Sequence, residues 1–173
     1  MILIPAAVLG LLEGSLRLFG YGYSTDFFIP AGDGEAFTGN PRFAWRYFPR
    51  PLARTPVVLR VAPEAPPQTL RILVLGGSAA MGTPEAAYGF GRVLEAMIRD
   101  ACGHDSAEVV VAAMTAVNSH VMLDVARDAA RFRPDVTVVY LGNNEVVGPF
   151  GPGTVFGGFT PSRSLIRASL WLR

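Results

Sequence analysis

The stretch RILVLGGSAAMG, residues 71–82, decides the fold. Its first part, RILVL, is a short apolar run of the kind found in strands that are buried on both faces. The run ends at Gly76 and Gly77, and Ser78 then precedes residues that favour a helix. This unit presents one hydroxyl group at a strand end, so Ser78 is either a helix N-cap or a functional residue.

The residues after this stretch continue the alternation of strands and helices. Apolar residues recur at helical spacing over 88–102 and 119–132, and buried strands are predicted over 108–114 and 135–142. Ser119 is the expected N-cap of the second helix. Strands and helices that alternate at this spacing form parallel pairs with right-handed crossovers. The sequence therefore predicts an α/β fold, a three-layer sandwich around a parallel sheet.

Three parts of the chain differ in composition. Residues 1–22 are hydrophobic, and we interpret them as the remnant of a membrane anchor; a buried N-terminal helix is the alternative. Residues 23–70 are rich in Pro, Gly and Arg, which predicts an extended connector with one strand over 55–61. Residues 71–173 are predicted to form the N-terminal part of an α/β domain and to end in an amphipathic helix over 162–173.

The composition excludes several kinds of site. A formal net charge of +1 gives no general attraction to nucleic acid, so we expect no nucleic-acid partner. All 15 basic residues are arginine, which excludes a phosphate-loop lysine and a Schiff-base lysine. The single cysteine, Cys102, excludes an internal disulfide. The hydrophobic N-terminal segment predicts membrane association on the extracytoplasmic side, with the cytoplasmic face as the alternative.

Small and polar residues stand at the carboxyl end of each predicted strand. Residues 76–78 (GGS) follow the first strand, residues 112–119 (AAMTAVNS) end the second, and residues 142–145 (GNNE) follow the third. In open parallel sheets, ligands bind beyond these strand ends. A serine beside neutral donors, such as a backbone N–H group and the amide of Asn144, suits acyl transfer.

Other interpretations of these residues stay open. Ser78 can be a plain N-cap, Asn143 and Asn144 can be turn residues, and Glu145 can be solvated. A glycine-rich loop can also bind a nucleotide phosphate, as in a flavodoxin-like protein. The glycines over 76–82 do not have the G-x-G-x-x-G spacing that such binding uses.

The two histidines are the candidate bases. His120 follows Ser119 near the second strand end, where it is either a base or a surface residue. His104 lies between a predicted helix and the next strand, so we expect it at the opposite end of the sheet and assign it no role.

Taken in order, the three strand ends resemble the sequence blocks of the SGNH (GDSL-like) hydrolase family. The residues similar to its first block, G-x-S with a later glycine, are Gly76, Gly77, Ser78 and Gly82. Those similar to its G-x-N-D block are Gly142, Asn143, Asn144 and Glu145. The second block fits loosely, with Ala116 where the family usually has a glycine. The resemblance covers residues 10–173 and extends to a bacterial, membrane-anchored subgroup that often carries tetratricopeptide repeats downstream.

The resemblance implies a role for three residues. Ser78 would be the nucleophile and would also donate its backbone N–H group to the oxyanion. Ala116 would donate its backbone N–H group, and Asn144 its side-chain amide. The resemblance implies no cofactor and no metal, and the substrate would be an acyl ester of a small molecule, a glycan or a lipid.

Besides Ala116, this sequence departs from the family pattern at three places. Gly77 and Glu145 each stand where the family usually has an aspartate. The Asp-x-x-His that supplies the family's base has no counterpart, since no Asp, Glu or His follows Glu145. We therefore expect a sheet that is incomplete at the C-terminus and a chain that is inactive alone.

Two functions follow from this resemblance. The first is a serine ester hydrolase or acyl-transfer domain of SGNH type. The alternative is a non-catalytic SGNH-like module that binds or links the parts of a membrane-associated, repeat-containing protein, with protein partners on downstream repeats.

Overall fold

The computed structural model describes residues 3–57, 59–104, 106–158, 160 and 162–171. Its centre is a parallel sheet with strand order β5-β4-β6. The three strands are β4 (Leu70–Gly76), β5 (Ala107–Ala113) and β6 (Val136–Tyr140). The predicted strands are therefore confirmed to within two residues at each end, and the strand that carries the quoted stretch is the central one.

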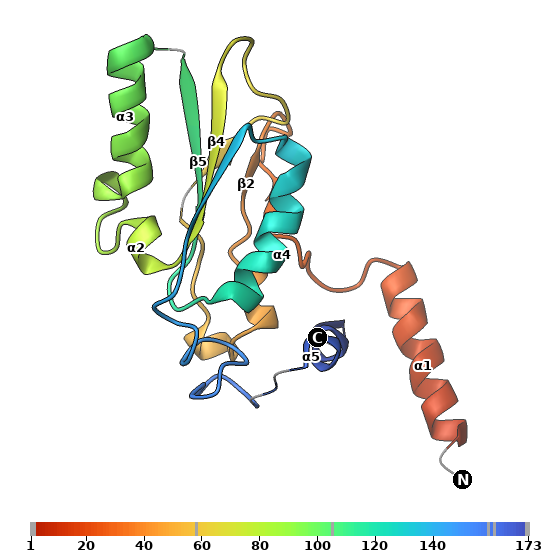
Figure 1. Ribbon diagram of the computed structural model, residues 1–173. Helices are drawn as coiled ribbons and strands as arrows, with labels where there is room; N and C mark the ends of the chain where they lie inside the picture. The colour runs from red at the N-terminus through yellow and green to blue at the C-terminus, as the bar shows by residue number, and fades with distance from the viewer. Residues whose placement is uncertain (1–2, 58, 105, 159, 161, 172–173) are drawn as a thin grey trace.

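Helices cover both faces of this sheet, which gives the three layers (Figure 1). On one face, α3 (Phe90–Cys102) packs against Val74, Val109 and Val111. On the other face, α4 (Ser119–Ala129) packs against Leu73, Leu75 and Val110. The core thus consists of two apolar clusters, one on each face of the sheet. Side chains that alternate along a strand point to opposite faces, which is why each strand serves both clusters. The predicted helices are confirmed, with the second one ending in a 3-10 turn, η4 (Ala130–Phe132).

The N-terminal end of α4 differs from the prediction. The N-cap is Asn118, and Ser119 is the first helical residue. Asn118 is fully buried and makes no capping hydrogen bond; its side-chain Nδ2 donates to the carbonyl oxygen of Pro149 at 2.9 Å.

Residues 23–70 do not form the extended connector that the sequence predicts. They contain an antiparallel sheet of β1 (Phe28–Pro30), β2 (Phe37–Gly39) and β3 (Arg60–Val61), with the 3-10 turns η1 (Phe43–Arg46) and η2 (Arg50–Leu52) between β2 and β3. The buried aromatic residues of this segment pack in the same cluster as α4; they are Phe27, Phe28, Phe43, Tyr47 and Phe48. The aromatic side chains supply the apolar area that orders a segment rich in proline and glycine.

The two edges of the parallel sheet are unlike each other. At the β5 edge, Val57 donates its backbone N–H group to the carbonyl oxygen of Ala113, and Pro56 forms a bridge with Met114. At the other edge, β6 pairs only with β4 among the described residues. Val139 and Tyr140 of β6 are 60% and 53% exposed, so apolar side chains stand open on both faces of this strand.

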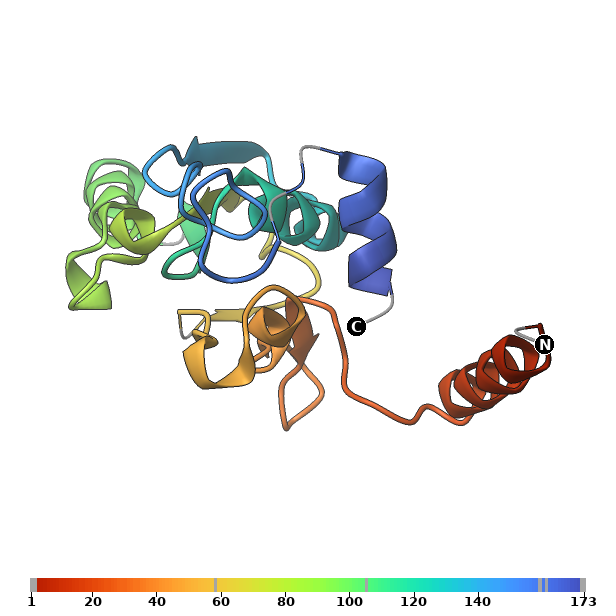
Figure 2. The same cartoon turned by 90° about the horizontal axis from the view of Figure 1, so that it is seen from below.

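Two helices lie at the ends of the chain. The first, α1 (Leu3–Leu18), has no buried residue and stands away from the sheet in both views (Figures 1 and 2). No helix in the described part of the chain has the length and apolar character that spanning a bilayer requires. The last helix, α5 (Arg163–Trp171), lies beside α4, and its Ile166 and Leu170 join the core (Figure 2).

Candidate functional site

Ser78 lies two residues after the last residue of the central strand, at the start of the short helix α2 (Ser78–Met81). The preceding Gly76 is packed so closely that a Cβ atom there would lie 2.3 Å from the Cβ of Ala80 and 2.7 Å from the carbonyl oxygen of Tyr140. Gly76 is therefore needed for α2 to fold back on the strand end. The helix has only four residues, so its dipole contributes little at Ser78.

Gly77 is not under the same constraint. A Cβ atom on Gly77 would meet nothing closer than the side-chain nitrogen of Asn144 at 3.5 Å, an ordinary contact. The backbone of Gly77 is extended, with φ at −88°. A side chain such as the aspartate usual in the SGNH pattern can therefore begin at this position without a clash.

Gly82 closes α2 in the left-handed conformation, with φ at +83°. A Cβ atom there would lie 2.6 Å from the backbone nitrogen of Gly89. Both the angle and the close approach require glycine, which gives the later glycine of the first block a structural reason.

Ala116 lies in the loop between β5 and α4 and also has a left-handed backbone, with φ at +64°. A residue other than glycine is uncommon in this region, because the Cβ atom crowds the carbonyl oxygen. The sequence resemblance places a glycine at this position, and the observed angle is the one that glycine adopts most easily.

Asn144 follows β6 and faces the loop that carries Ala116. Its side-chain Nδ2 donates to the carbonyl oxygen of Val117 at 3.1 Å. This bond holds the Asn144 amide close to Gly77 and hence to the start of α2.

These three strand ends enclose a small hollow of about 10 Å³, which is room for about one water molecule. The residues that line it are Gly77, Ser78, Ala79, Val117, Tyr140, Leu141, Gly142, Asn143 and Asn144. The structure thus brings Ser78 and Asn144 to one hollow, together with Gly142 and Asn143. Ala116 is not among the lining residues, although its neighbour Val117 is.

Glu145 is engaged and does not point freely into solvent. One carboxylate oxygen accepts from the backbone N–H group of Ser119 at 3.0 Å, and the other accepts from the Ser119 hydroxyl at 2.7 Å. The carboxylate therefore caps α4 from a different element, so the alternative in which Glu145 contacts only solvent does not hold.

Neither histidine lines the hollow, and no Asp or Glu among the described residues does so either. His104 lies between α3 and β5, at the opposite end of the sheet from Ser78, as predicted. His120 is the second residue of α4, and its ring and that of Phe150 lie perpendicular, with centroids 6.2 Å apart. Among the described residues, no cluster of three or more His, Cys, Asp or Glu is placed to hold a metal ion.

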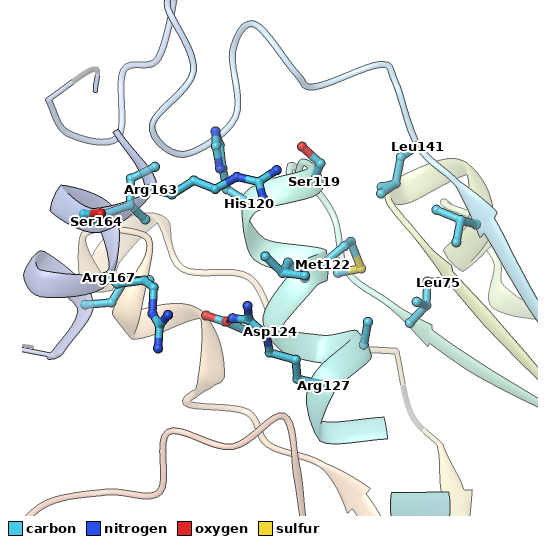
Figure 3. Close-up of a pocket in the computed structure, with 15 residues that line it drawn as sticks. Leu75, Ser119, His120, Met122, Asp124, Arg127, Leu141, Arg163, Ser164 and Arg167 are labelled. Carbon is cyan, nitrogen blue, oxygen red and sulfur yellow. The ribbon is translucent and has the colours of Figure 1, made fainter. Parts of the chain in front are cut away.

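The sequence gives no sign of a second and larger cavity, which we call the α4–α5 cavity (Figure 3). It has a volume of about 510 Å³ and is lined by residues of α4 and α5, by Leu75 and Val139 of the sheet, and by Leu141. Leu141 also lines the hollow at Ser78. A cavity between helices that are far apart in the sequence depends on their relative placement, which residue spacing does not reveal.

Comparisons of this chain with protein-family models, with curated proteins and with solved structures gave no match. The SGNH resemblance therefore rests on the residues at the strand ends.

Proposed function

We propose that the hollow at Ser78 is the acyl-ester site of a serine ester hydrolase or acyl-transfer domain of SGNH type. Ser78 is the nucleophile, and the oxyanion of the tetrahedral intermediate receives hydrogen bonds from the backbone N–H groups of Ser78 and Ala116 and from the Asn144 amide. The substrate is an acyl ester carried by a small molecule, a glycan or a lipid.

One observation carries this proposal. Three adjacent parallel strands are followed by the turn at Ser78, the left-handed loop at Ala116 and the segment that carries the Asn144 amide. A 3.1 Å hydrogen bond from Asn144 to Val117 joins the last two of these segments. Neutral donors that surround a serine suit a developing oxyanion and offer no countercharge for a phosphate.

A serine hydroxyl needs a base within hydrogen-bond reach to act as a nucleophile near neutral pH. The described residues that line the hollow include no His, Asp or Glu, and Glu145 is held by Ser119. We therefore expect this chain alone to hydrolyse esters slowly. In triad enzymes that lack one member, binding and the oxyanion hole leave about 10³–10⁴-fold catalysis over water.

The test is hydrolysis of p-nitrophenyl acetate by the wild-type chain and by Ser78→Ala, each with and without added imidazole. We expect a slow wild-type rate that falls to the buffer rate in Ser78→Ala. Imidazole supplies a base, so it should accelerate the wild type more than Ser78→Ala. Ser106→Ala, at the other end of the sheet, is the matched control and should behave as the wild type.

Two outcomes count against this account. Equal rates for the wild type and Ser78→Ala in both conditions would reject Ser78 as a nucleophile. A Ser78-dependent turnover of about 1 per second without imidazole would mean that a base is already in reach and would point to His120.

A non-catalytic binding or linking module is the second candidate. The observation that favours it is the size of the hollow, about 10 Å³, which excludes an acyl group unless the rim opens. This candidate predicts that the Ser78→Ala chain keeps every measurable property of the wild type, and the same assay separates the two functions.

We also propose that α1 holds the protein at a membrane surface. Its exposed apolar residues are Leu3, Ile4, Val8, Leu9, Leu11, Leu12 and Leu18. An exposed apolar helix removes its side chains from water when it enters the headgroup and acyl region of a bilayer. Co-sedimentation with phosphatidylcholine vesicles tests this proposal: the wild type should sediment with the vesicles, and the double variant Leu9→Asp/Leu12→Asp should stay in the supernatant. Equal sedimentation of both would reject it.

A further inference from the structure

We propose that the α4–α5 cavity binds a single-chain amphiphile with an anionic head, an alkyl carboxylate or alkyl phosphate. This inference goes beyond the esterase proposal and does not depend on it, because it concerns binding on the α4 face of the sheet and assigns no reaction. The argument rests on the apolar floor, the charges at the rim and the volume of the cavity.

The apolar residues that line the cavity come from three parts of the fold. Leu75 and Val139 contribute from the sheet, Met122 and Leu123 from α4, and Ile166 and Leu170 from α5. Figure 3 shows Leu75 and Met122 facing each other across the inner part of the cavity. An alkyl chain bound here would bury its own apolar surface and that of the protein. The protein surface includes Val139, which is 60% exposed.

The rim of the cavity carries an excess of positive charge. Arg163 and Arg167 come from α5, and Arg127 comes from α4. In Figure 3 the side chain of Arg163 extends from α5 toward the first turn of α4. No acidic residue occurs after Glu145 in the sequence, and in the described part of the chain neither Arg163 nor Arg167 forms an ion pair. The guanidinium groups of these two arginines can therefore donate to a ligand anion.

Among the described residues that line the cavity, the only acidic one, Asp124, already has its own partners. It accepts a hydrogen bond from the hydroxyl of Tyr47 at 2.6 Å and forms an ion pair with Arg127 at 3.2 Å. Burial of Tyr47, together with the nearby Asp124 charge, raises the pKa of the Tyr47 hydroxyl far above its ordinary value, so the hydroxyl stays a donor. Asp124 thus has its own partners and leaves the α5 arginines to the ligand.

The volume of about 510 Å³ falls in the range of small-molecule sites, about 300–1,000 Å³. A mostly apolar cavity with a few charged groups at one side suits a ligand with one tail and one head. Two unpaired guanidinium groups select a carboxylate or phosphate head over a neutral or cationic one.

Isothermal titration calorimetry on the full chain tests this assignment. The ligands are decanoate, decyl phosphate, decanol and decyltrimethylammonium, each below its micelle concentration. We expect the two anions to bind more tightly than decanol, and decanol more tightly than the cation. Lengthening the carboxylate from octanoate to decanoate should raise the affinity by about fourfold per methylene.

The double variant Arg163→Gln/Arg167→Gln isolates the charge contribution without touching the core. It should lower decanoate affinity by at least about tenfold and leave decanol binding unchanged. Arg54→Gln, an exposed arginine outside the cavity, is the matched control and should bind decanoate as the wild type does. The ratio of decanoate to decyl phosphate affinity identifies the preferred head.

Three outcomes would overturn the proposal. The first is equal affinity for decanoate and decanol, which would reduce the cavity to a non-selective apolar surface. The second is an unchanged decanoate affinity in the double variant. The third is binding to anionic phospholipid vesicles with no binding of the monomeric amphiphiles, which would make this face a bilayer contact and not a ligand site.

Discussion

Glu145 and Ser119 form a two-point contact across the loops that follow β6 and β5. The carboxylate accepts from the Ser119 backbone N–H group at 3.0 Å and from the Ser119 hydroxyl at 2.7 Å. Glu145 directly follows Asn144, the proposed oxyanion donor, and its carboxylate also fixes the start of α4. The loop that holds Asn144 is thereby tied to the helix that packs under the sheet.

Removal of this contact should destabilise the protein modestly. Glu145→Ala leaves the first N–H group of α4 without its acceptor, which should lower the free energy of unfolding by about 1 kcal/mol, the usual cost of losing a helix cap. Urea unfolding followed by circular dichroism gives this value. Glu64→Ala, an exposed glutamate, is the control and should stay within about 0.5 kcal/mol of the wild type. Equal losses in both variants would mean that the cap contributes nothing.

The two adjacent glycines before Ser78 should respond in opposite ways to alanine. Gly76→Ala places a methyl group 2.3 Å from Ala80 and should cost about 1–3 kcal/mol through overpacking. Gly77→Ala meets nothing within 3.5 Å and should add about 0.4–1 kcal/mol, because alanine restricts the unfolded chain. Urea unfolding of both variants checks the pair, and similar stabilities would contradict the packing described at Gly76.

Ala116 should tolerate glycine and reject a β-branched residue. Ala116→Gly relieves a left-handed strain of about 1–2 kcal/mol and adds an entropy cost of about 0.5–1 kcal/mol, so it should be neutral or slightly stabilising. Ala116→Val places a branched side chain at a φ of +64° and should be clearly destabilising. Thermal unfolding ranks the variants. As a control, Ala126→Gly inside α4 should cost about 1 kcal/mol; an equal loss in Ala116→Gly would contradict the left-handed backbone.

Asp128 and Asp33 should give opposite dependences of stability on pH. Burial raises the pKa of Asp128 above its usual 3.8, although the Phe28 N–H group and Arg131 partly offset the shift. The stabilising contribution of Asp128 is therefore complete below pH 3.8 and falls as the pH rises through the raised pKa. The hydrogen bond from Arg60 lowers the pKa of Asp33, so its contribution is present above pH 3.8 and falls as the pH drops through the lowered value.

Urea unfolding of Asp128→Asn and Asp33→Asn between pH 3 and pH 7 measures both effects. Relative to the wild type, Asp128→Asn should gain stability as the pH rises, and Asp33→Asn should lose it. Shifts of the same sign in the two variants would contradict the assignment of burial at Asp128 or of the ion pair at Asp33.

Regular patterns in the sequence were enough to predict the central layers. The apolar run after Arg71 and the helical spacing over 88–102 each correspond to an observed element, because local periodicity reports which face is buried. Arg71 itself is only 1% exposed and donates to Glu108 at 2.8 Å, and the apolar pattern gave no sign that this charged side chain is buried. A buried ion pair between neighbouring strands depends on their register, which the sequence does not specify.

Part of the candidate site was predictable from the order of the strands and helices along the chain. The meeting of Ser78 with Asn144 follows from parallel strands, whose carboxyl ends share one edge. The partner of Glu145 and the packing of Phe156 on Phe48, with ring centroids 4.8 Å apart, depend on long-range loop placement. Neither contact has a local sequence signal. For the same reason, the sequence predicts an extended connector over residues 23–70, where the structure has an antiparallel sheet.

The difference between the two sheet edges has a consequence for native-state hydrogen exchange. The amide protons between β4 and β5 join the central strand to a strand whose carboxyl end is held by Pro56 and Val57, so they should exchange only when the whole domain opens. Those that join β6 to β4 have no strand on their outer side in the described part of the chain. They should exchange through partial detachment of β6, at a lower opening free energy. Local opening free energies should therefore decrease across the sheet from β5 to β6, and a molecule that binds beside β6 should slow exchange there first.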